Sequence, residues 1–432
     1  MAKAKKWVLL ANSFDDSMAR NMTAFHAASS LDMEYVTEYR YVDLWVDGDY
    51  QGTYILGEKS EINENRLNLT DPTGVLMELD NFFYGQEDYW FLDAYLNYKF
   101  AVKECVDEDN PNSVLSGMDQ FRDKLDRFWN YITNTDTSVI TLESLGAYID
   151  VESFARWYLV NEFASNVEAA STSCFFYMDG AGDVIHMGPV WDFDSCMGNK
   201  KEYSDITLMF IRTNNKIFNR LLRIPAFAEY TKNILVQYDS AFESLALYAE
   251  DTGTLIKESA AINYTRWDRL EQKNEKRDLI DFAGTYEVAV ERLKNWLVNR
   301  YGFFTGKTDV TASLEGKNIV VRINDYHRLS SVNVAAWTKD NGQKDLKWKS
   351  SGRNGGIFTV TFPLTQFLSA GKVLIHVYGD GVFRKEASVT IPAPEVEYRI
   401  SEDGTSLTVT SSGPSIYDSL KNSSLVRGKR SG

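Results

Sequence analysis

The chain contains little cysteine, little histidine and no long apolar run. Three cysteines and four histidines occur among 432 residues, and no C-x-x-C pair is present. This scarcity excludes a disulfide framework and a cysteine-built zinc site, so we expect Cys105, Cys174 and Cys196 to be buried thiols. A membrane-spanning helix needs roughly 18 consecutive apolar residues, and the sequence has no such stretch. The apolar stretch near the N-terminus is also too short for a signal peptide.

Basic side chains are fewer than acidic ones. Lys and Arg number 46 against 61 Asp and Glu, which gives a formal net charge of -15. This balance disfavours nucleic acid or an anionic membrane as the main partner and accommodates a basic one. The chain is 44% hydrophobic and 13% aromatic. That composition suffices for large cores, and the length favours two or three domains.

The N-terminal segment is predicted to be a sheet with one helix. Residues 7–10 form an apolar strand so near the start that we expect further sequence upstream of it, with any export signal. A helix is predicted over 15–31, with acidic residues at its start, packed on this strand. Asp47-Gly48 supplies the positive φ angles of a tight hairpin turn between two strands. Another strand is predicted at 74–80.

Helices are predicted to dominate the middle of the chain. Apolar residues at helical spacing predict helices at 121–132 and 282–301. An aromatic-rich helix is predicted from Val151 to Phe163, with Asp150 capping it. Two short strands interrupt the helices, at 174–177 and 183–187.

After Gly306 the apolar residues alternate as in strands. The short strands and their Gly-containing turns predict a β-sandwich, with Trp337 and Trp348 in its core and His376 as a structural or solvated residue. Residues 393–432 are expected to be a linker and a tail, and the final LVRGKRSG is expected to carry no fold. The strands are predicted at 310–314, 318–323, 332–337, 346–348, 358–362, 373–378 and 388–391.

Two carboxylates follow an apolar run in the segment Trp191-Asp192-Phe193-Asp194. If this run is a strand, side chains two residues apart point the same way, so Asp192 and Asp194 would face one site. Such hard oxygen ligands suit Mg²⁺ or Mn²⁺ held against a phosphate. Alternatively, one Asp caps the following turn and the other is solvated.

A second polar cluster lies upstream, at Asn161-Glu162 and Asn166-Val167-Glu168. These side chains could complete a metal shell or orient a hydroxyl nucleophile, because phosphoryl transfer depends on positioning and charge neutralisation. Alternatively, Asn166 caps the C-terminus of the preceding helix. We expect Asp192 and Asp194 on the floor of a cleft between a sheet-rich and a helical lobe, with Asn166 or Glu168 within one ligand shell.

The order of several motifs resembles the CotH family of spore-coat kinases over residues 5–305. The motifs are Lys6 to Asn12 with Asp15 and Arg20-Asn21, Tyr50 to Leu56 with Glu58-Lys59, Asn161-Glu162 with Asn166, and Gly188 to Asp194 with Gly198. The resemblance implies an atypical, two-lobed kinase fold. It also implies that ATP and a divalent metal are bound, and that Ser or Thr of protein partners is phosphorylated.

The same resemblance assigns roles to individual residues. Asp192 resembles the metal-binding Asp of the family, with Asp194 beside it, and Asn166 resembles the catalytic-loop Asn and a further metal ligand. Glu168 stands where many relatives have Asp, which keeps the carboxylate on a longer side chain. Glu58, Lys59 and Glu78 are predicted to face the cofactor, although Glu58 is equally compatible with a solvated strand end.

Relatives also carry strands and a nucleotide-contacting Lys upstream of the point where this sequence starts. The resemblance therefore implies weak metal-dependent ATP binding and slow transfer by this chain.

Residues 308–392, with Val334 to Trp337, Asp345 to Trp348 and Gly371 to Tyr378, resemble the Bsp-like repeat of Gram-positive surface proteins. This second resemblance implies an extracellular spacer or adhesive module.

The predicted fold class is α+β: a two-lobed kinase-like domain followed by an all-β immunoglobulin-like sandwich. The predicted function is that of a secreted or cell-surface Ser/Thr kinase that uses ATP with Mg²⁺ or Mn²⁺ on basic protein partners. Two alternatives stay open, a degenerate kinase fold that serves as a binding scaffold and an adhesin that binds proteins or glycans. The predicted domains are 1–305, with lobes at 1–105 and 106–305, then 306–392 and 393–432.

Overall fold

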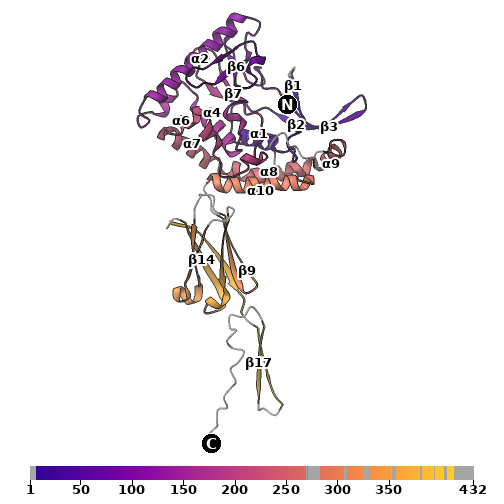
Figure 1. Cartoon of the computed structure of the whole chain (residues 1–432), viewed down its shortest axis with the longest axis vertical. Helices are drawn as coiled ribbons and strands as arrows, with labels where there is room; N and C mark the ends of the chain where they lie inside the picture. Colours follow the sequence, from indigo (N-terminus) through magenta and orange to yellow (C-terminus); the bar gives the residue numbers. More distant parts are fainter. Residues whose placement is uncertain are drawn as a thin grey trace. The chain divides into compact units, whose positions relative to one another are not determined.

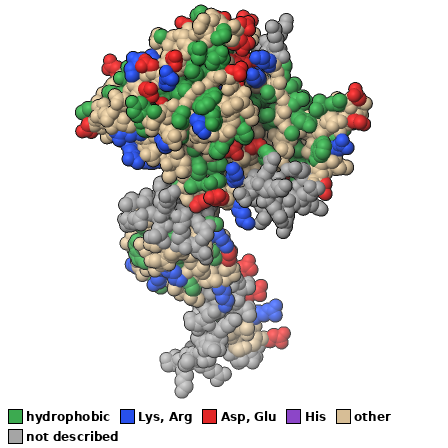
Figure 2. Space-filling view, turned by 45° about the horizontal axis from the view of Figure 1, so that its top comes forward, with side chains coloured by type: hydrophobic (Ala, Val, Ile, Leu, Met, Phe, Trp, Pro, Cys, Tyr) green, Lys and Arg blue, Asp and Glu red, His purple; other side chains and the backbone are tan. Residues whose placement is uncertain are grey.

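The structure is a computed structural model that describes residues 6–268, 270, 283–305, 309–324, 331–352, 357–379, 382–393, 395–402 and 406–412 (Figure 1). It divides into two compact units, Met1–Tyr301 and Gly302–Gly432. Within the described ranges, no helix is both long and apolar enough to cross a membrane. Figure 2 shows acidic and basic side chains interspersed on one face of the first unit, with hydrophobic patches between them.

The first unit contains a three-stranded antiparallel sheet of order β1-β3-β2. Its strands are β1 (Trp7–Leu10), β2 (Tyr39–Val46) and β3 (Asp49–Glu58). The predicted hairpin turn is confirmed, because Asp47 and Gly48 have φ angles of 52° and 88°. Glycine accepts the second angle without the steric cost that a Cβ atom would add.

A five-stranded antiparallel sheet forms the centre of the first unit, with the order β5-β6-β4-β7-β8. Its strands are β4 (Val75–Leu79), β5 (Trp90–Leu92), β6 (Lys99–Cys105), β7 (Cys174–Met178) and β8 (His186–Met187). Helices α2 (Pro111–Asn134) and α4 (Val151–Phe163) cover one face. Phe121 of α2 and Phe154 of α4 place their rings 6.1 Å and 6.3 Å from that of Phe176 in β7. Edge and tilted contacts of this kind anchor helices on a sheet.

Acidic side chains accept hydrogen bonds from free amides at or near the starts of two helices. The predicted start of α4 is confirmed, because the Asp150 carboxylate accepts a hydrogen bond from the Ser153 amide at 2.6 Å. Helix α1 (Arg20–Ser30) begins five residues later than the prediction of a helix from 15. There, the Asp15 carboxylate accepts hydrogen bonds from the amides of Ser17 and Arg20, and Met18 has a φ angle of 55°. A left-handed residue ends any helix, so the acidic pair precedes α1 in a separate turn.

The remaining helices complete the first unit. Helix α1 packs against α4 and α8, and α9 packs against β3. The three cysteines are buried and unpaired, as predicted. The helices are α3 (Leu142–Leu145), α5 (Phe210–Asn214), α6 (Lys216–Leu221), α7 (Pro225–Gln237), α8 (Asp239–Leu255), α9 (Lys257–Arg266) and α10 (Tyr286–Thr305).

The second unit is an all-antiparallel β region, and the seven strands predicted from alternation are present in it. Two sheets, of order β13-β10-β9 and β12-β11-β14-β15, contribute apolar side chains to one shared core. Residues 395–412, within the expected linker and tail, contain a further strand pair, and the final LVRGKRSG lies outside the described residues. The strands are β9 (Asp309–Glu315), β10 (Asn318–Asn324), β11 (Ser331–Thr338), β12 (Lys347–Gly352), β13 (Ile357–Pro363), β14 (Gly371–Gly379), β15 (Val382–Ile391), β16 (Glu395–Ile400) and β17 (Leu407–Ser412).

The prediction that Trp337 and Trp348 lie in this core is wrong. Trp348 is 55% exposed and Trp337 is half-buried. Trp337 alternates with core residues along β11, and Trp348 pairs with Ala335, which lies between core residues of the same strand. Both tryptophans therefore project from the other side of the sheet. Hydrophobic character alone does not decide which face of a two-sided strand a ring occupies.

Candidate functional site

Asp192 and Asp194 line a cavity of about 230 Å³ together with residues 9–13, Asn21 and Trp191. The carboxylates do not reach this cavity through strand alternation, because β8 ends at Met187 and residues 188–193 form no strand. Instead, Asp192 adopts a left-handed conformation with φ of 63°. A non-glycine residue is strained there, and such strain is concentrated at functional sites.

The environment of Asp192 opposes its ionisation. Burial, together with the negative charges of Glu168 and Asp194, raises the pKa of this carboxyl to about 8. The Ser173 hydroxyl donates to Asp192 Oδ2 at 3.2 Å, which favours the charged form. A divalent cation would offset this crowding of carboxylates, so the donor set fits Mg²⁺ or Mn²⁺ in chemical type. However, no three His, Cys, Asp or Glu side chains in the described ranges are placed to bind one metal ion.

The Asn166 side chain connects the two polar segments of the site. Its amide nitrogen donates to Asn161 Oδ1 at 3.0 Å and to the Asp192 carbonyl at 3.2 Å. Its amide oxygen accepts from the backbone amides of Glu168 and Ala169 at 3.1 Å and 3.3 Å. The fully buried Asn166 therefore holds the Glu168 loop against the backbone of Asp192. Lys200 lies 3.8 Å from Glu168 Oε1 and is the cation nearest to that carboxylate among the described ion pairs.

The other wall of the cavity is tied to this segment by hydrogen bonds between side-chain amides and the backbone. Asn21 Oδ1 accepts from the Phe193 amide at 2.9 Å, and Asn199 Nδ2 donates to the carbonyls of Phe14 and Asp194, each at 2.6 Å. Gly198 has a φ angle of 76°, and a Cβ atom there would lie 2.4 Å from the Trp296 ring. Only glycine fits this position, so the motif ending at Gly198 serves close packing beside the cavity.

Glu58, Lys59 and Glu78, predicted to face the cofactor, occur in ion pairs. Lys59 Nζ lies 3.0 Å from a Glu104 carboxylate oxygen, and Glu58 lies 3.9 Å from the Arg66 guanidinium. None of the three is among the residues that line the cavity of Asp192 and Asp194, within the described part of the chain. Their assignment to the cofactor stays a prediction.

Glu78 illustrates how such a pair differs from the candidate site. Its carboxylate lies 3.2 Å from Lys103 Nζ. Burial raises the pKa of Glu78, while the positive charge of Lys103 opposes that rise. Asp192 has no comparable cation among the causes that shift its pKa. The compensated carboxylate is typical of a structural pair, whereas the uncompensated one is typical of a ligand site.

In the sequence analysis Asn12 was placed in the family motif but was given no role. It is 7% exposed with φ of 50°, and neither of its amide atoms has a hydrogen-bond partner among the described residues. A buried, unsatisfied amide costs about 1–3 kcal/mol, so it calls for an explanation such as an absent ligand. The available signal was an Asn directly after the first apolar strand, where strand-end side chains gather.

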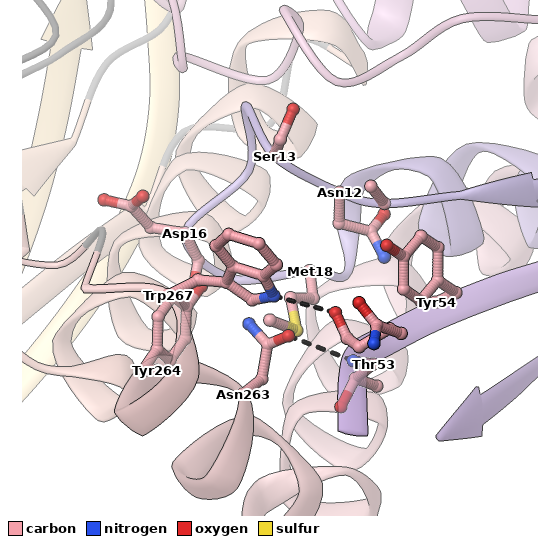
Figure 3. A pocket seen from close by; sticks show the side chains of 11 residues that line it. Asn12, Ser13, Asp16, Met18, Thr53, Tyr54, Asn263, Tyr264 and Trp267 are labelled. Atoms are coloured by element: carbon pink, nitrogen blue, oxygen red, sulfur yellow. Dashed lines mark hydrogen bonds between the residues drawn. The ribbon is translucent and has the colours of Figure 1, made fainter. Parts of the chain in front are cut away.

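Asn12 also lines a second cavity, of about 280 Å³, which shares residues 11–13 with the first. Figure 3 shows Asn12 and Tyr54 across from Trp267 and Tyr264. Trp267 Nε1 donates to the Gln51 carbonyl at 2.8 Å, and the Asn263 side chain accepts from the Thr53 amide at 3.0 Å. These contacts hold α9 and the segment after it against β3, so the aromatic wall is fixed in place.

Comparisons with known proteins match both parts of the chain. The family described as CotH kinase protein matches residues 1–304, and the family described as GBS Bsp-like repeat matches residues 310–391. The crystal structure of a polysaccharide deacetylase from Bacillus cereus is similar over 21% of this chain and 31% of that chain, at 20% identity and a TM-score of 0.18. No curated protein matches this chain. The first match covers well over half of the sequence and both resemblances are confirmed, so the chain belongs to the CotH kinase family and carries a GBS Bsp-like repeat.

Proposed function

We propose that the chain is an ATP-dependent Ser/Thr protein kinase whose site is the cavity of Asp192 and Asp194. The observation that carries the proposal is the burial of Asp192 and its crowding by Glu168 and Asp194 beside one cavity, which together raise its pKa to about 8. A kinase family implies ATP use, and kinases bind the phosphates of ATP together with a divalent metal ion. The half-buried carboxylates would then be ligands of Mg²⁺ or Mn²⁺, and the bound ion would neutralise charge on the phosphates.

In this proposal each polar side chain has a separate role. Glu168 accepts the proton of the substrate hydroxyl as that oxygen attacks the γ-phosphorus, and ADP leaves. Asn166 positions Glu168 through its bonds to the backbone amides of residues 168 and 169. Asn12 offers a donor and an acceptor to the nucleotide from a desolvated position, where a hydrogen bond is strongest.

The finer architecture is part of the same proposal. We assign the three-stranded sheet and its surroundings to a lobe over 1–105 and the helices to a lobe over 106–305, as in a two-lobed atypical kinase. We assign residues 306–392 to an immunoglobulin-like sandwich and 393–432 to a linker and tail. The Bsp-like repeat supports a secreted or cell-surface location, and the net charge of -15 supports basic protein substrates.

A second candidate function is a kinase fold that acts as a binding scaffold or adhesin. Two observations favour it. The Asn166 oxygen already accepts two backbone hydrogen bonds, which limits it as a metal ligand. The described residues also lack a group of three side chains placed for one metal. Under this alternative, proteins or glycans bind without phosphoryl transfer.

Calorimetry with ATP and Mg²⁺ or Mn²⁺ tests the proposal. We expect metal-dependent binding by the natural chain and at least a tenfold loss in Asp192→Ala, in line with the roughly 10²-fold effects of single electrostatic contacts. Asp119→Ala, on the exposed face of α2, is the matched control and should bind normally. A radiolabel assay with a Ser-rich basic peptide then separates a kinase from a scaffold. Binding that Asp192→Ala leaves unchanged would show that Asp192 is not a metal ligand.

A further inference from the structure

Four aromatic side chains form a connected row on the four-stranded sheet of the second unit. Trp337 of β11 lies 4.7 Å from His376 of β14, measured between ring centroids. His376 lies 6.4 Å from Tyr378, and Tyr378 lies 5.3 Å from Trp348 of β12. The row therefore crosses three neighbouring strands of one sheet.

Strand pairing explains why these rings share a face. Ala335 of β11 pairs with Trp348 on one side and with His376 on the other. Asn333, two residues away, pairs with Tyr378. Residues directly opposite each other in paired strands point to the same face. The residues between them, such as Val334 and Ile375, point to the shared core, so the rings project from the opposite side.

Packing in the shared core does not explain this row. The core on the inner face is closed by aliphatic and Phe side chains from both sheets. Trp348 is nevertheless 55% exposed, and the other three rings are half-buried. A large ring held in water on a rigid sheet is a feature of binding surfaces, because Trp and Tyr provide wide contact at low entropic cost.

The neighbours of the rings indicate the class of ligand. The Ser350 hydroxyl donates to Asn333 Oδ1 at 2.6 Å beside the Trp348–Tyr378 pair. Ser331, Ser388 and Thr390 add exposed hydroxyls on the same side of the sheet. Hydroxyls and amides interleaved with flat rings match a ligand that has both apolar faces and a hydroxyl rim, which is the chemistry of a pyranose sugar.

The charge on this face narrows the class of ligand further. Among its described side chains, Glu386 is paired with His376 at 3.7 Å, and Lys372 lies near one end. The face is therefore close to neutral in a chain whose net charge is -15. An anionic polymer would need an excess of cations, and a hydrophobic helix of a protein would leave the hydroxyls and amide unpaired. A neutral glycan needs no excess of cations and can pair with the hydroxyls and the amide.

We propose that the outer face of this sheet binds a neutral glycan chain. Successive sugar rings pack their C–H faces on Trp348, Tyr378 and the remaining rings of the row. Asn333 and Ser350 exchange hydrogen bonds with the sugar hydroxyls. This activity is separate from nucleotide binding and does not depend on it.

The test uses the full chain, with hexamers of β-1,4-linked glucose and β-1,4-linked N-acetylglucosamine as probes in calorimetric titrations. We expect binding to at least one hexamer, weakened about tenfold in Trp348→Ala and Tyr378→Ala, and less in Asn333→Ala. Trp45→Ala, which removes a Trp that is 61% exposed in the first unit, is the matched control and should bind normally. Thermal unfolding confirms that each variant is folded.

Two further results decide the proposal. Asp192→Ala should bind the hexamers as the natural chain does, because the two sites are independent. No binding of either hexamer by the natural chain would overturn the proposal, and so would full binding by Trp348→Ala. Preferential binding of a sulfated polysaccharide over both neutral hexamers would also overturn it.

Discussion

The core of the first unit contains large rings and polar side chains, whereas both tryptophans of the second unit lie outside its core. Trp157 and Phe121 are fully buried in the first unit, and so are the polar side chains of Glu162, Asn166 and Arg300. The second unit has a mainly aliphatic core, with Trp348 exposed. The comparison shows that the feature by which a candidate site is recognised differs between the two units. Buried polar groups stand out in the first unit, and exposed rings stand out in the second.

The largest effect is expected from Arg300→Ala in α10. The buried guanidinium donates to the carbonyls of Phe163, Ile206 and Glu162. Its removal leaves buried acceptors without donors, so the unfolding free energy of the first unit should fall by about 4–5 kcal/mol. Urea unfolding followed by tryptophan fluorescence measures this change. Lys294→Ala, which removes an exposed ion pair on the same helix, should cost less than about 1 kcal/mol.

In the second unit the largest loss of stability is expected from Phe358→Ala. Phe358 of β13 is fully buried in the shared core. Its truncation should destabilise this unit by about 3–4 kcal/mol through lost apolar contact and a residual cavity. The neighbouring Ile357→Ala is exposed and should change stability little. If the unfolding transitions of both units shift together in Phe358→Ala, the units are not independent, and the comparison between them fails.

A smaller, pH-dependent effect is expected from Asp126→Asn in α2. Burial and the adjacent Asp93 raise the pKa of Asp126 from 3.8 to about 6. The folded state thus binds this proton more tightly than the unfolded state. The associated stability is complete below about pH 4 and is lost as the pH rises through 6.

Asn cannot ionise, so Asp126→Asn should be more stable than the natural chain at pH 7, by roughly half a kcal/mol because the side chain is only half-buried and solvent screens its charge. The difference should disappear near pH 4. Urea titrations at both pH values measure it. An equal difference at the two pH values would exclude ionisation of Asp126 as its cause.

The smallest effect is expected from Arg322→Ala in β10. Arg322 pairs with Glu315 across the sheet, but both side chains are almost half exposed. Solvent screens such a pair, so the unfolding midpoint should stay within experimental error. A clear loss of stability would show that this exposed ion pair stabilises the second unit, contrary to the expectation that only buried charged groups such as Arg300 contribute strongly.

Local signals were sufficient to predict several elements. Asp150 and the periodic apolar residues after it predicted both ends of α4, and Asp47-Gly48 predicted the hairpin turn. The start of α1 was wrong because Asp15 bonds to amides in a preceding turn, and acidic residues favour turns as well as helix starts. Strand alternation in the second unit was correct, yet alternation does not say which face is the core. Trp337 and Trp348 were therefore placed on the wrong side.

The candidate site was predictable in residue type and not in geometry. The sequence identified Asp192 and Asp194, and the structure brings both to one cavity. Their arrangement rests on the left-handed conformation of Asp192 and on contacts with residues 9–21, which no local pattern encodes. The role of Asn12 was missed for the same reason, since the absence of a partner is a property of the folded chain.

The hydrogen bonds that join Asn21 to Phe193 and Phe14 to Asn199 have a consequence for synthesis on the ribosome. They connect residues 172 and 185 positions apart in the chain. At about 5–20 residues per second, the early segment waits on the order of ten seconds or longer for its partners to be made. The cavity of Asp192 and Asp194 is therefore a late product of translation, and its walls cannot be joined until residue 199 has emerged.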